Sequence, residues 1–342
     1  MVIKKYQLLK YKHPTETVDL TDAPCIAIGK KAFFKKNKPE EVIFPTQISA
    51  VKAYAFAKCG HLKNVVIPED TRIGLSTSSF FNCQRLQNLQ NSEGITVIGN
   101  TVFKNCYALE QIHLGSELRR IGEYAFQNCH SLKEIALTSE IQLIGRYAFS
   151  GCWSLEKVVL EEGFTSISEG MFQNCIALKE VEIPSTVSKI SAYAYQNCSA
   201  LEQIFIPCNV KSIDKGAFSG CSRLKSANIE LGCTKIGAYA FANNRELEDI
   251  VLPHSVKHLG FGAFGFRKRE KKIQICVDNE YMLRRIRRKL FWCGSFLGAE
   301  AVMIGKNIEE RKRERRRKTL EQNAVHISEN PHFSQKNSED LN

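Results

Sequence analysis

Tryptophan and methionine are scarce in this chain, with two and four copies among 342 residues, and no long apolar run is present. The longest apolar stretch, residues 290–304, has about fifteen residues and contains Glu300, so it is too short and too polar to cross a bilayer. Residues 1–12 contain no apolar core followed by a small-residue cleavage site, so no secretory signal is expected. These absences favour a location in a reducing cytoplasm.

The chain also lacks the short motifs that organise enzyme and metal sites. It has no G-x-S-x-G, P-loop, H-E-x-x-H or C-x-x-C, and no G-x-G-x-x-G follows a long strand. His254 and His258 have a spacing that would suit a metal on a helix, but Pro253 lies beside them and a surface loop is the favoured interpretation. We therefore expect no catalytic residue, cofactor, metal or small-molecule substrate.

What the chain does contain is a repeat. An aromatic residue, here called the anchor, recurs every 23 residues, with a single spacing of 24 between Phe56 and Phe80. The anchors are Phe33, Phe56, Phe80, Phe103, Phe126, Phe149, Phe172, Tyr195, Phe218, Phe241 and Phe264. This period lies in the range of leucine-rich repeats, in which each copy forms one turn of a solenoid.

Fixed positions around the anchor predict the shape of one turn. Leucine stands six residues after most anchors, and apolar residues stand nine and eleven after, as Ile135 and Leu137 do after Phe126. That period of two predicts a short strand with one face inward. The segment around the anchor is expected to be a short helical turn, ended two residues after the anchor by an Asn or Gly in the left-handed conformation.

Stacked turns of this kind predict the fold class. We expect an α/β solenoid, a right-handed leucine-rich-repeat superhelix of about eleven 23-residue turns with one parallel sheet and short helical turns opposite it. Residues 1–24 would form an N-terminal cap and 25–277 the solenoid, with 273–277 as the last strand. Residues 278–304 would form a C-terminal capping helix region, and 305–342 a basic helical and then disordered tail.

The turn sequence resembles the BspA-type leucine-rich repeat, whose typical turn reads IG..AF..C..L..I.IP. Segments such as YAFQNCHSLKEIAL and YAYQNCSALEQIFIP carry the match, which extends over residues 25–277. Members of that family are commonly bacterial or protist surface proteins that bind host or neighbouring-cell proteins. The resemblance implies a role in protein interaction, and it sets a cell-surface location beside the cytoplasmic one.

Eight of the 13 cysteines stand three residues after an anchor, which places them in one inward column. They are Cys59, Cys83, Cys106, Cys129, Cys152, Cys175, Cys198 and Cys221. Free cysteine packs as a small apolar side chain, and parallel side chains on stacked turns point the wrong way to form disulfides. We interpret the column as core packing, in preference to a disulfide stack or a metal ladder.

The outward strand positions, eight and ten residues after the anchor, vary freely from turn to turn, whereas the inward positions barely change. Solenoids bind partners along such a face. Val159 and Phe205 are apolar where water is expected, and the turn between them carries Glu180 and Glu182. With Gln203 these residues form a candidate partner-binding site, the alternative being apolar surface scattered without a function.

The formal net charge of +12 is concentrated at the two ends of the chain. Residues 265–342 hold 19 Lys and Arg against 11 Asp and Glu, and residues 1–40 hold nine against four. A cationic run in the tail is either simply solvated or contacts the phosphates of nucleic acid or of an anionic membrane without sequence specificity. Its candidate phosphate contacts are Arg311, Lys312, Arg313, Arg315, Arg316, Arg317 and Lys318.

The pattern as a whole favours a non-enzymatic scaffold that binds a protein partner through the exposed strand face. The sequence does not name that partner. A cell-surface adhesin of the same family and a phosphate-binding protein that acts through its basic tail are the alternatives.

Overall fold

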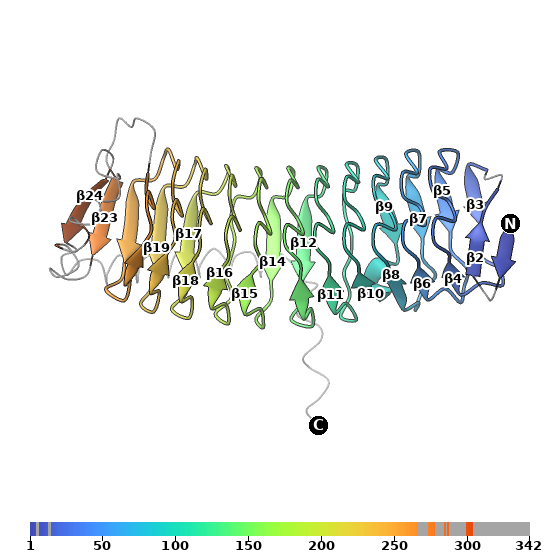
Figure 1. Ribbon diagram of the computed structural model, residues 1–342, viewed down its shortest axis with the longest axis horizontal. Coiled ribbons are helices and arrows are strands. Elements are labelled where there is room, and N and C mark those ends of the chain that lie inside the picture. Colours follow the sequence, from blue (N-terminus) through green and yellow to red (C-terminus); the bar gives the residue numbers. More distant parts are fainter. Residues whose placement is uncertain are drawn as a thin grey trace, which may run out of the picture.

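The chain forms an elongated rod of stacked turns in the computed structural model (Figure 1). The structure describes residues 1–4, 7–12, 15–265, 273–277, 284, 286 and 299–303. The predicted solenoid of about eleven turns is confirmed, because strands of successive turns pair in parallel along most of the rod. None of the helical segments in this described part has the length and apolarity that crossing a bilayer requires.

Each turn passes through a corner, which we define as the ten residues from four before to five after the anchor. The strands that follow the corner form the first ribbon, which carries the predicted strand face. They are β3 (Thr17–Asp19), β5 (Glu41–Ile43), β7 (Asn64–Val66), β9 (Asn88–Gln90), β12 (Glu134–Leu137), β14 (Lys157–Leu160), β17 (Gln203–Ile206), β19 (Ser226–Ile229), β21 (Asp249–Leu252), β23 (Ile273–Val277) and β24 (Ala299–Met303).

The strands that precede the corner form a second ribbon, also parallel within itself. They are β2 (Gln7–Lys10), β4 (Ala27–Ile28), β6 (Ala50–Val51), β8 (Ile73–Leu75), β10 (Ile95–Ile98), β11 (Arg120–Ile121), β13 (Leu143–Ile144), β15 (Ser166–Ile167), β16 (Lys189–Ile190), β18 (Ser212–Ile213), β20 (Lys235–Ile236) and β22 (His258–Leu259). β1 (Val2–Lys4) pairs antiparallel with β2, and the 3-10 helix η1 spans Ser92–Gly94.

Two details of the predicted turn are wrong. There are two rows of strands and not one parallel sheet, because the apolar position five residues before each anchor, Ile121 for example, also lies in a strand. The corner is not helical either. Its backbone has a left-handed residue at each end, two before and two after the anchor, as at Tyr124 (φ 55°) and Asn128 (φ 62°). A left-handed residue every four positions prevents an α-helix from continuing.

The corner is held instead by hydrogen bonds between turns. The backbone N–H groups of Tyr124, Phe126 and Asn128 donate to carbonyls of the next turn at 2.9, 2.7 and 2.8 Å. These bonds replace the i to i−4 bonds of a helix, so each corner depends on its neighbour. The Asn or Gly predicted two residues after the anchor is left-handed, as expected, and Asn128 Nδ2 also donates to Asn105 Oδ1 at 2.9 Å.

The core is built from columns that run along the rod. The anchors from Phe33 to Phe264 are buried and stack ring on ring, with centroids 4.7 Å apart for the Phe33–Phe56 pair and 6.0 Å for the Phe241–Phe264 pair. The leucine six residues after the anchor and the inward strand residues, such as Leu132 and Ile135, are buried beside them. One continuous apolar core therefore extends through every described turn.

The eight column cysteines are free and buried, in agreement with the interpretation as core packing. Their thiols also make a hydrogen bond that packing alone does not require. Each Sγ lies 3.0–3.3 Å from the backbone carbonyl of the anchor one turn earlier, as Cys129 does from Phe103. Cysteine thus combines a small apolar volume with a weak donor for a buried acceptor.

The column changes at the C-terminal end of the solenoid. Asn244 takes the cysteine position after Phe241 and is fully buried, and neither amide atom has a partner within the described part of the chain. A buried amide without partners costs about 1–3 kcal/mol, so this turn packs less favourably than its neighbours.

The last strand was predicted incorrectly, because β24 follows β23 and pairs with it in parallel along five residues. Its strand lies inside the range 278–304, which was expected to hold only a capping helix. Arg284 and Ile286 are helical and Ile286 is buried in the core cluster. The remainder of that range, and the tail 305–342, lie outside the described residues.

Candidate functional site

The outward columns of the first ribbon face solvent, as the alternation predicted. In the middle of the rod, Val159 on β14 and Phe205 on β17 each keep 42% of their surface accessible. Glu180 and Glu182 are exposed on the turn between these strands, and Gln203 is exposed two residues before Phe205. The five candidate residues therefore lie on three successive turns and form one surface, here called the strand-face patch.

The strand-face patch lies at one of two interruptions of the first ribbon, a feature that the sequence did not reveal; the other is at residues 109–115, between β9 and β12. β14 pairs with β12 and β17 pairs with β19, but no strand is assigned to residues 178–184 between them. Carboxylates fill both outward positions of this turn, and glutamate is a weak strand former. The patch thus combines two exposed apolar side chains, two carboxylates and a turn whose backbone leaves the regular ladder.

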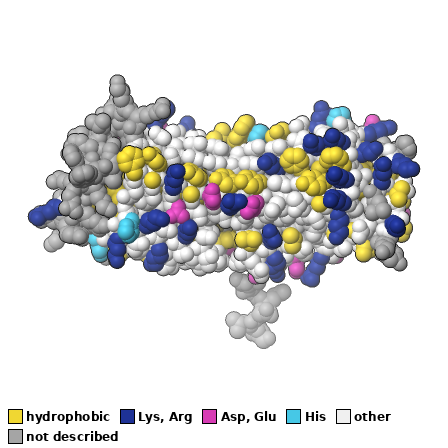
Figure 2. All heavy atoms as spheres, viewed as in Figure 1, with side chains coloured by type: hydrophobic (Ala, Val, Ile, Leu, Met, Phe, Trp, Pro, Cys, Tyr) yellow, Lys and Arg dark blue, Asp and Glu magenta, His cyan; other side chains and the backbone are white. Residues whose placement is uncertain are grey.

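Apolar side chains form a band along the middle of the face that Figure 2 shows. Such side chains are exposed on both ribbons. On the second ribbon, Val97 on β10 is 38% exposed and Leu143 on β13 is 50% exposed. Exposure alone therefore does not single out the strand-face patch, and the second ribbon supplies matched positions for experiments.

A column of alternating charge borders the first ribbon, seven residues after each anchor. Its members from turn 1 to turn 10 are Glu40, Lys63, Gln87, Glu110, Lys133, Glu156, Lys179, Glu202, Lys225 and Glu248. Neighbouring turns form ion pairs along it, for example Lys179 Nζ to Glu156 Oε2 at 2.8 Å. The hydrogen bond from that ammonium group, and then its charge, lower the pKa of Glu156. The column neutralises itself and contributes little net field to a partner.

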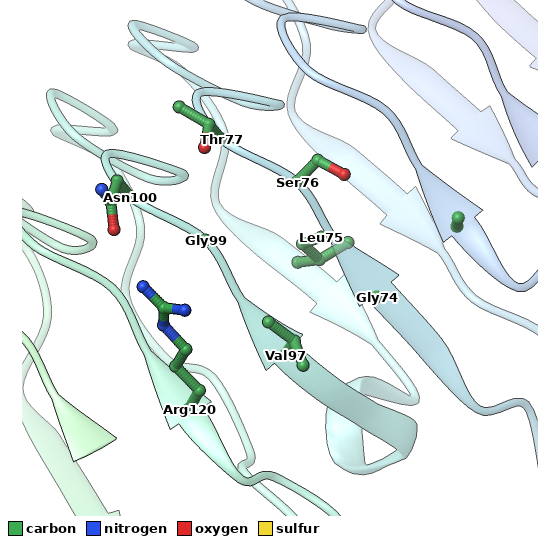
Figure 3. Close-up of a pocket in the computed structure, with 9 residues that line it drawn as sticks. Gly74, Leu75, Ser76, Thr77, Val97, Gly99, Asn100 and Arg120 are labelled. Atoms are coloured by element: carbon green, nitrogen blue, oxygen red, sulfur yellow. The ribbon is translucent and has the colours of Figure 1, made fainter.

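The second ribbon carries a shallow groove, formed by two depressions of about 380 and 360 Å³ that share Asn100 and Arg120. Figure 3 shows Arg120 rising from β11 beside Gly99 and Asn100. Glycine is required at the floor because a Cβ on Gly99 would lie 2.8 Å from the nitrogen of Thr77, and one on Gly122 2.5 Å from that of Asn100. The groove is therefore a consequence of tight stacking between turns.

Polar groups at the groove bind one another. Arg146 pairs with Glu123 at 3.3 Å, and the Tyr147 hydroxyl donates to Glu169 at 2.9 Å. Burial, and then the bond to Glu169, raise the pKa of Tyr147 to about 12, so its hydroxyl stays protonated near neutrality. Within the described residues, no group of three or more His, Cys, Asp or Glu side chains has the arrangement of a metal site.

The comparisons with known proteins give a family. A model of the BspA type leucine-rich repeat region, in six copies, matches residues 26–155 and 142–270. The chain belongs to the BspA-type leucine-rich-repeat family. No curated protein matches its sequence significantly.

Several solved structures resemble this BspA-type chain. A leucine-rich cell surface protein from Faecalibacterium prausnitzii is 21% identical over 77% of this chain and 91% of its own, with a TM-score of 0.45. A leucine-rich-repeat protein from T. pallidum is 28% identical over 47% and 78%, with a TM-score of 0.45. The pneumococcal vaccine antigen PcpA is 16% identical over 84% of each chain, again with a TM-score of 0.45.

The BspA-type motif itself contributes no site. Its isoleucine, phenylalanine, cysteine and leucine positions are buried in the core, as Ile121, Phe126, Cys129 and Leu132 show. Function must therefore come from positions outside the motif. Of those predicted, the structure brings the strand-face patch together, whereas residues 311–318 of the tail lie outside the described residues.

Proposed function

We propose that this BspA-type protein is a non-enzymatic scaffold that binds a protein partner through the strand-face patch. The observation that carries the proposal is the coincidence of exposed apolar side chains, Val159 and Phe205, with one of the two interruptions of the first ribbon, at the turn between them. The core columns are occupied by structural side chains, and the outward columns are the ones that change freely along the chain. Leucine-rich-repeat proteins commonly use such a surface for protein partners.

The patch indicates the chemistry of the partner. Two turns separate Val159 from Phe205, which places their Cα atoms about 10 Å apart. Glu180 and Glu182 lie between them, and both are exposed. A partner that inserts an apolar side chain on each side of a Lys or Arg would complement this order, because aromatic and apolar anchors supply most of the energy of an interface.

The test is a comparison of two matched double variants. The partner is first captured from an extract of the source cells, identified and purified, and its affinity is then measured by titration calorimetry. Val159→Ser combined with Phe205→Ala should weaken binding by at least about thirtyfold, as loss of a central anchor does. Val97→Ser combined with Leu143→Ser removes two exposed apolar side chains from the second ribbon and should leave the affinity within about threefold. A larger loss of partner affinity in the second-ribbon variant than in the Val159→Ser, Phe205→Ala variant would contradict binding through the strand-face patch.

The cellular setting is part of the proposal. A reducing compartment is supported by the eight column cysteines, which are buried and form no disulfide. The cell-surface adhesin remains the alternative, and labelling of intact cells separates the two. Exposed Cys208 should react with a thiol reagent that cannot cross membranes only after the cells are broken; labelling of intact cells would place the protein at the surface.

The basic tail remains a prediction. Contact of residues 311–318 with nucleic acid or an anionic membrane was inferred from composition, and those residues lie outside the described part of the chain. The proposed scaffold function does not depend on them.

A further inference from the structure

The corners of the first four turns are strongly basic. Over residues 29–38, 52–61, 76–85 and 99–108 they hold nine cationic side chains and no acidic one. The nine are Lys30, Lys31, Lys35, Lys36, Lys38, Lys52, Lys58, Arg85 and Lys104. The corners of turns 5–10 differ, with four basic residues (Arg146, Lys215, Arg223, Arg245) and four acidic ones (Glu123, Glu169, Asp214, Glu246). We call the nine-residue surface the basic corner.

The cations of the basic corner are accessible, although Glu40, just outside the corner and hydrogen-bonded to Lys63, also feels the charge of Arg85. Six of the nine side chains are exposed and three are half-buried. Among the described residues, none of the nine forms an ion pair, and Lys36 donates only to the backbone carbonyl of Lys12 at 3.4 Å. Figure 2 shows Lys and Arg side chains gathered at the end of the rod that holds the N-terminal turns.

Three of these lysines occupy backbone positions that favour other residues. Lys31, Lys35 and Lys58 have φ values of 58°, 59° and 63°. Two residues after the anchor, where Lys35 and Lys58 stand, later turns use Asn or Gly, as at Asn105. At the position of Lys31, two before the anchor, they use Tyr in several turns and Gly in others, as at Gly170. A long side chain without local hydrogen-bonding ability is strained there, and strain retained at a surface points to a function. Stability alone does not explain lysine at the positions of Lys35 and Lys58.

Aromatic side chains are interleaved with the lysines. Tyr54 is 37% exposed within the basic corner, and Phe34 and Phe81 are half-buried there. The ammonium groups of Lys31 and Lys35 lie over the Phe34 ring, 5.4 and 5.5 Å from its centroid. Cations that follow a backbone beside rings on which bases stack are the usual combination in surfaces that bind single strands.

We propose that the basic corner binds the phosphate backbone of a single-stranded nucleic acid. Four turns span about 15 Å, a length along which several phosphates of one strand can lie. Eight of the nine cations are lysines, which act as point charges and do not read base edges in the bidentate way of arginine, so binding is independent of sequence. This surface is separate from the strand-face patch and does not rest on its function.

The basic corner has few of the exposed apolar side chains that attachment to a membrane requires. Among the described residues of the corner, Tyr54 is the one exposed aromatic side chain, and no Trp, Leu, Ile or Phe there is exposed. Stable membrane attachment normally adds buried apolar side chains to the electrostatic attraction. Sulfated polysaccharides would satisfy the lysines but not the rings, because they lack bases to stack.

The experiment replaces lysines by the residues that later turns use at the same positions. In the full chain, Lys31→Gly, Lys35→Asn and Lys58→Asn are combined, and binding of fluorescein-labelled dT20 is measured by anisotropy from 0.05 to 0.3 M salt. Affinity at 0.1 M salt should fall at least tenfold, and the slope of log K against log salt should become shallower by about 2. Thermal stability should hold or rise, because left-handed strain is relieved.

The matched control removes three positive charges elsewhere, through Lys133→Asn, Lys157→Asn and Lys211→Asn, and should change dT20 affinity less than threefold. An equal loss in both triple variants, or no loss in the corner variant, overturns the proposal. A second variant, Tyr54→Gly, distinguishes a nucleic acid from a sulfated polysaccharide as the anionic ligand. It should weaken dT20 binding about fivefold or more through lost stacking and leave binding to heparin unchanged. Equal effects on dT20 and heparin, or tighter binding to vesicles of phosphatidylserine and phosphatidylcholine than to dT20, would also overturn it.

Discussion

Raising the pH from 8 to 10 is expected to remove a large part of the stability of this solenoid. The eight column thiols are buried against anchor carbonyls, and burial raises the pKa of each above its ordinary value of 9.0. For Cys59, Cys152 and Cys221 the pKa reaches about 12. In the unfolded chain the same thiols meet water and ionise near pH 9.

The loss of stability at high pH follows from the number of protons bound by the folded and unfolded states. Between about pH 9 and 12 the folded state keeps its thiol protons and the unfolded state loses them, so the free energy of unfolding falls as pH rises. Below pH 9 both states are protonated and the contribution of the thiols is fully present. Each thiol removes about 1 kcal/mol for each pH unit above 9, so eight together remove on the order of 10 kcal/mol by pH 10, comparable to the whole stability of a typical domain.

Urea unfolding followed by circular dichroism at pH 8, 9 and 10 measures this loss. Other groups titrate in the same window, so the decisive quantity is the change between variants. Cys129→Ala should reduce the pH-dependent loss between pH 8 and 10 by about 1 kcal/mol, one thiol's share. The control is Cys208→Ser, because Cys208 is exposed and its thiol meets water in both states. A Cys129→Ala protein with an unchanged pH dependence would contradict the buried column.

Phe126→Ala is expected to destabilise the protein by roughly 3–5 kcal/mol. Phe126 is fully buried near the middle of the rod and stacks on Phe103 at 5.2 Å and on Phe149 at 5.1 Å. Its backbone also joins two turns, so a cavity there weakens both neighbouring interfaces. In a solenoid each turn contacts only its neighbours, and a weak interface in the middle divides the cooperative unit.

Chemical denaturation at pH 7 measures the loss of stability caused by Phe126→Ala. Phe126→Leu fills most of the volume without the ring and should lose clearly less than the alanine variant. Gln127→Ala, beside the anchor and half-buried at the surface, should change stability by no more than about 0.5 kcal/mol. A loss below about 1 kcal/mol for Phe126→Ala would show that the anchor column does not hold the stack together.

Much of this fold can be predicted from the 23-residue period of the sequence. The 23-residue spacing, the leucine six residues after the anchor and the cysteine column can be read from the sequence because each position repeats one packing environment in every turn. The left-handed residue two after the anchor was also predictable, since Asn and Gly mark it. These features are local or strictly repeated, and one sequence contains many copies of each.

Other features of the fold depend on contacts that the period does not describe. The left-handed residue two before the anchor is often Tyr, as at Tyr124, which gives no propensity signal for that conformation. The corner was predicted to be helical because its composition is typical of a short helix that ends at Asn or Gly. Its N–H groups instead donate hydrogen bonds to carbonyls of the next turn. β24 lies beyond the last repeat, and its pairing with β23 is set by the open end of the ribbon.

The candidate site was only partly predictable for the same reason. Alternation placed Val159 and Phe205 outward, but the interruption of the first ribbon between them is a property of pairing across turns. The basic character of residues 1–40 was visible as composition. That these lysines gather on one corner without acidic neighbours became clear only once the turns were stacked.

Hydrogen–deuterium exchange of the full chain, with and without its purified protein partner, tests the central claim most directly. Binding through the strand-face patch should slow exchange in β14, in residues 178–184 and in β17, while β13, β15 and β16 of the second ribbon stay unchanged. Protection confined to the second ribbon or to the corners, with β14 and β17 unaffected, would contradict it.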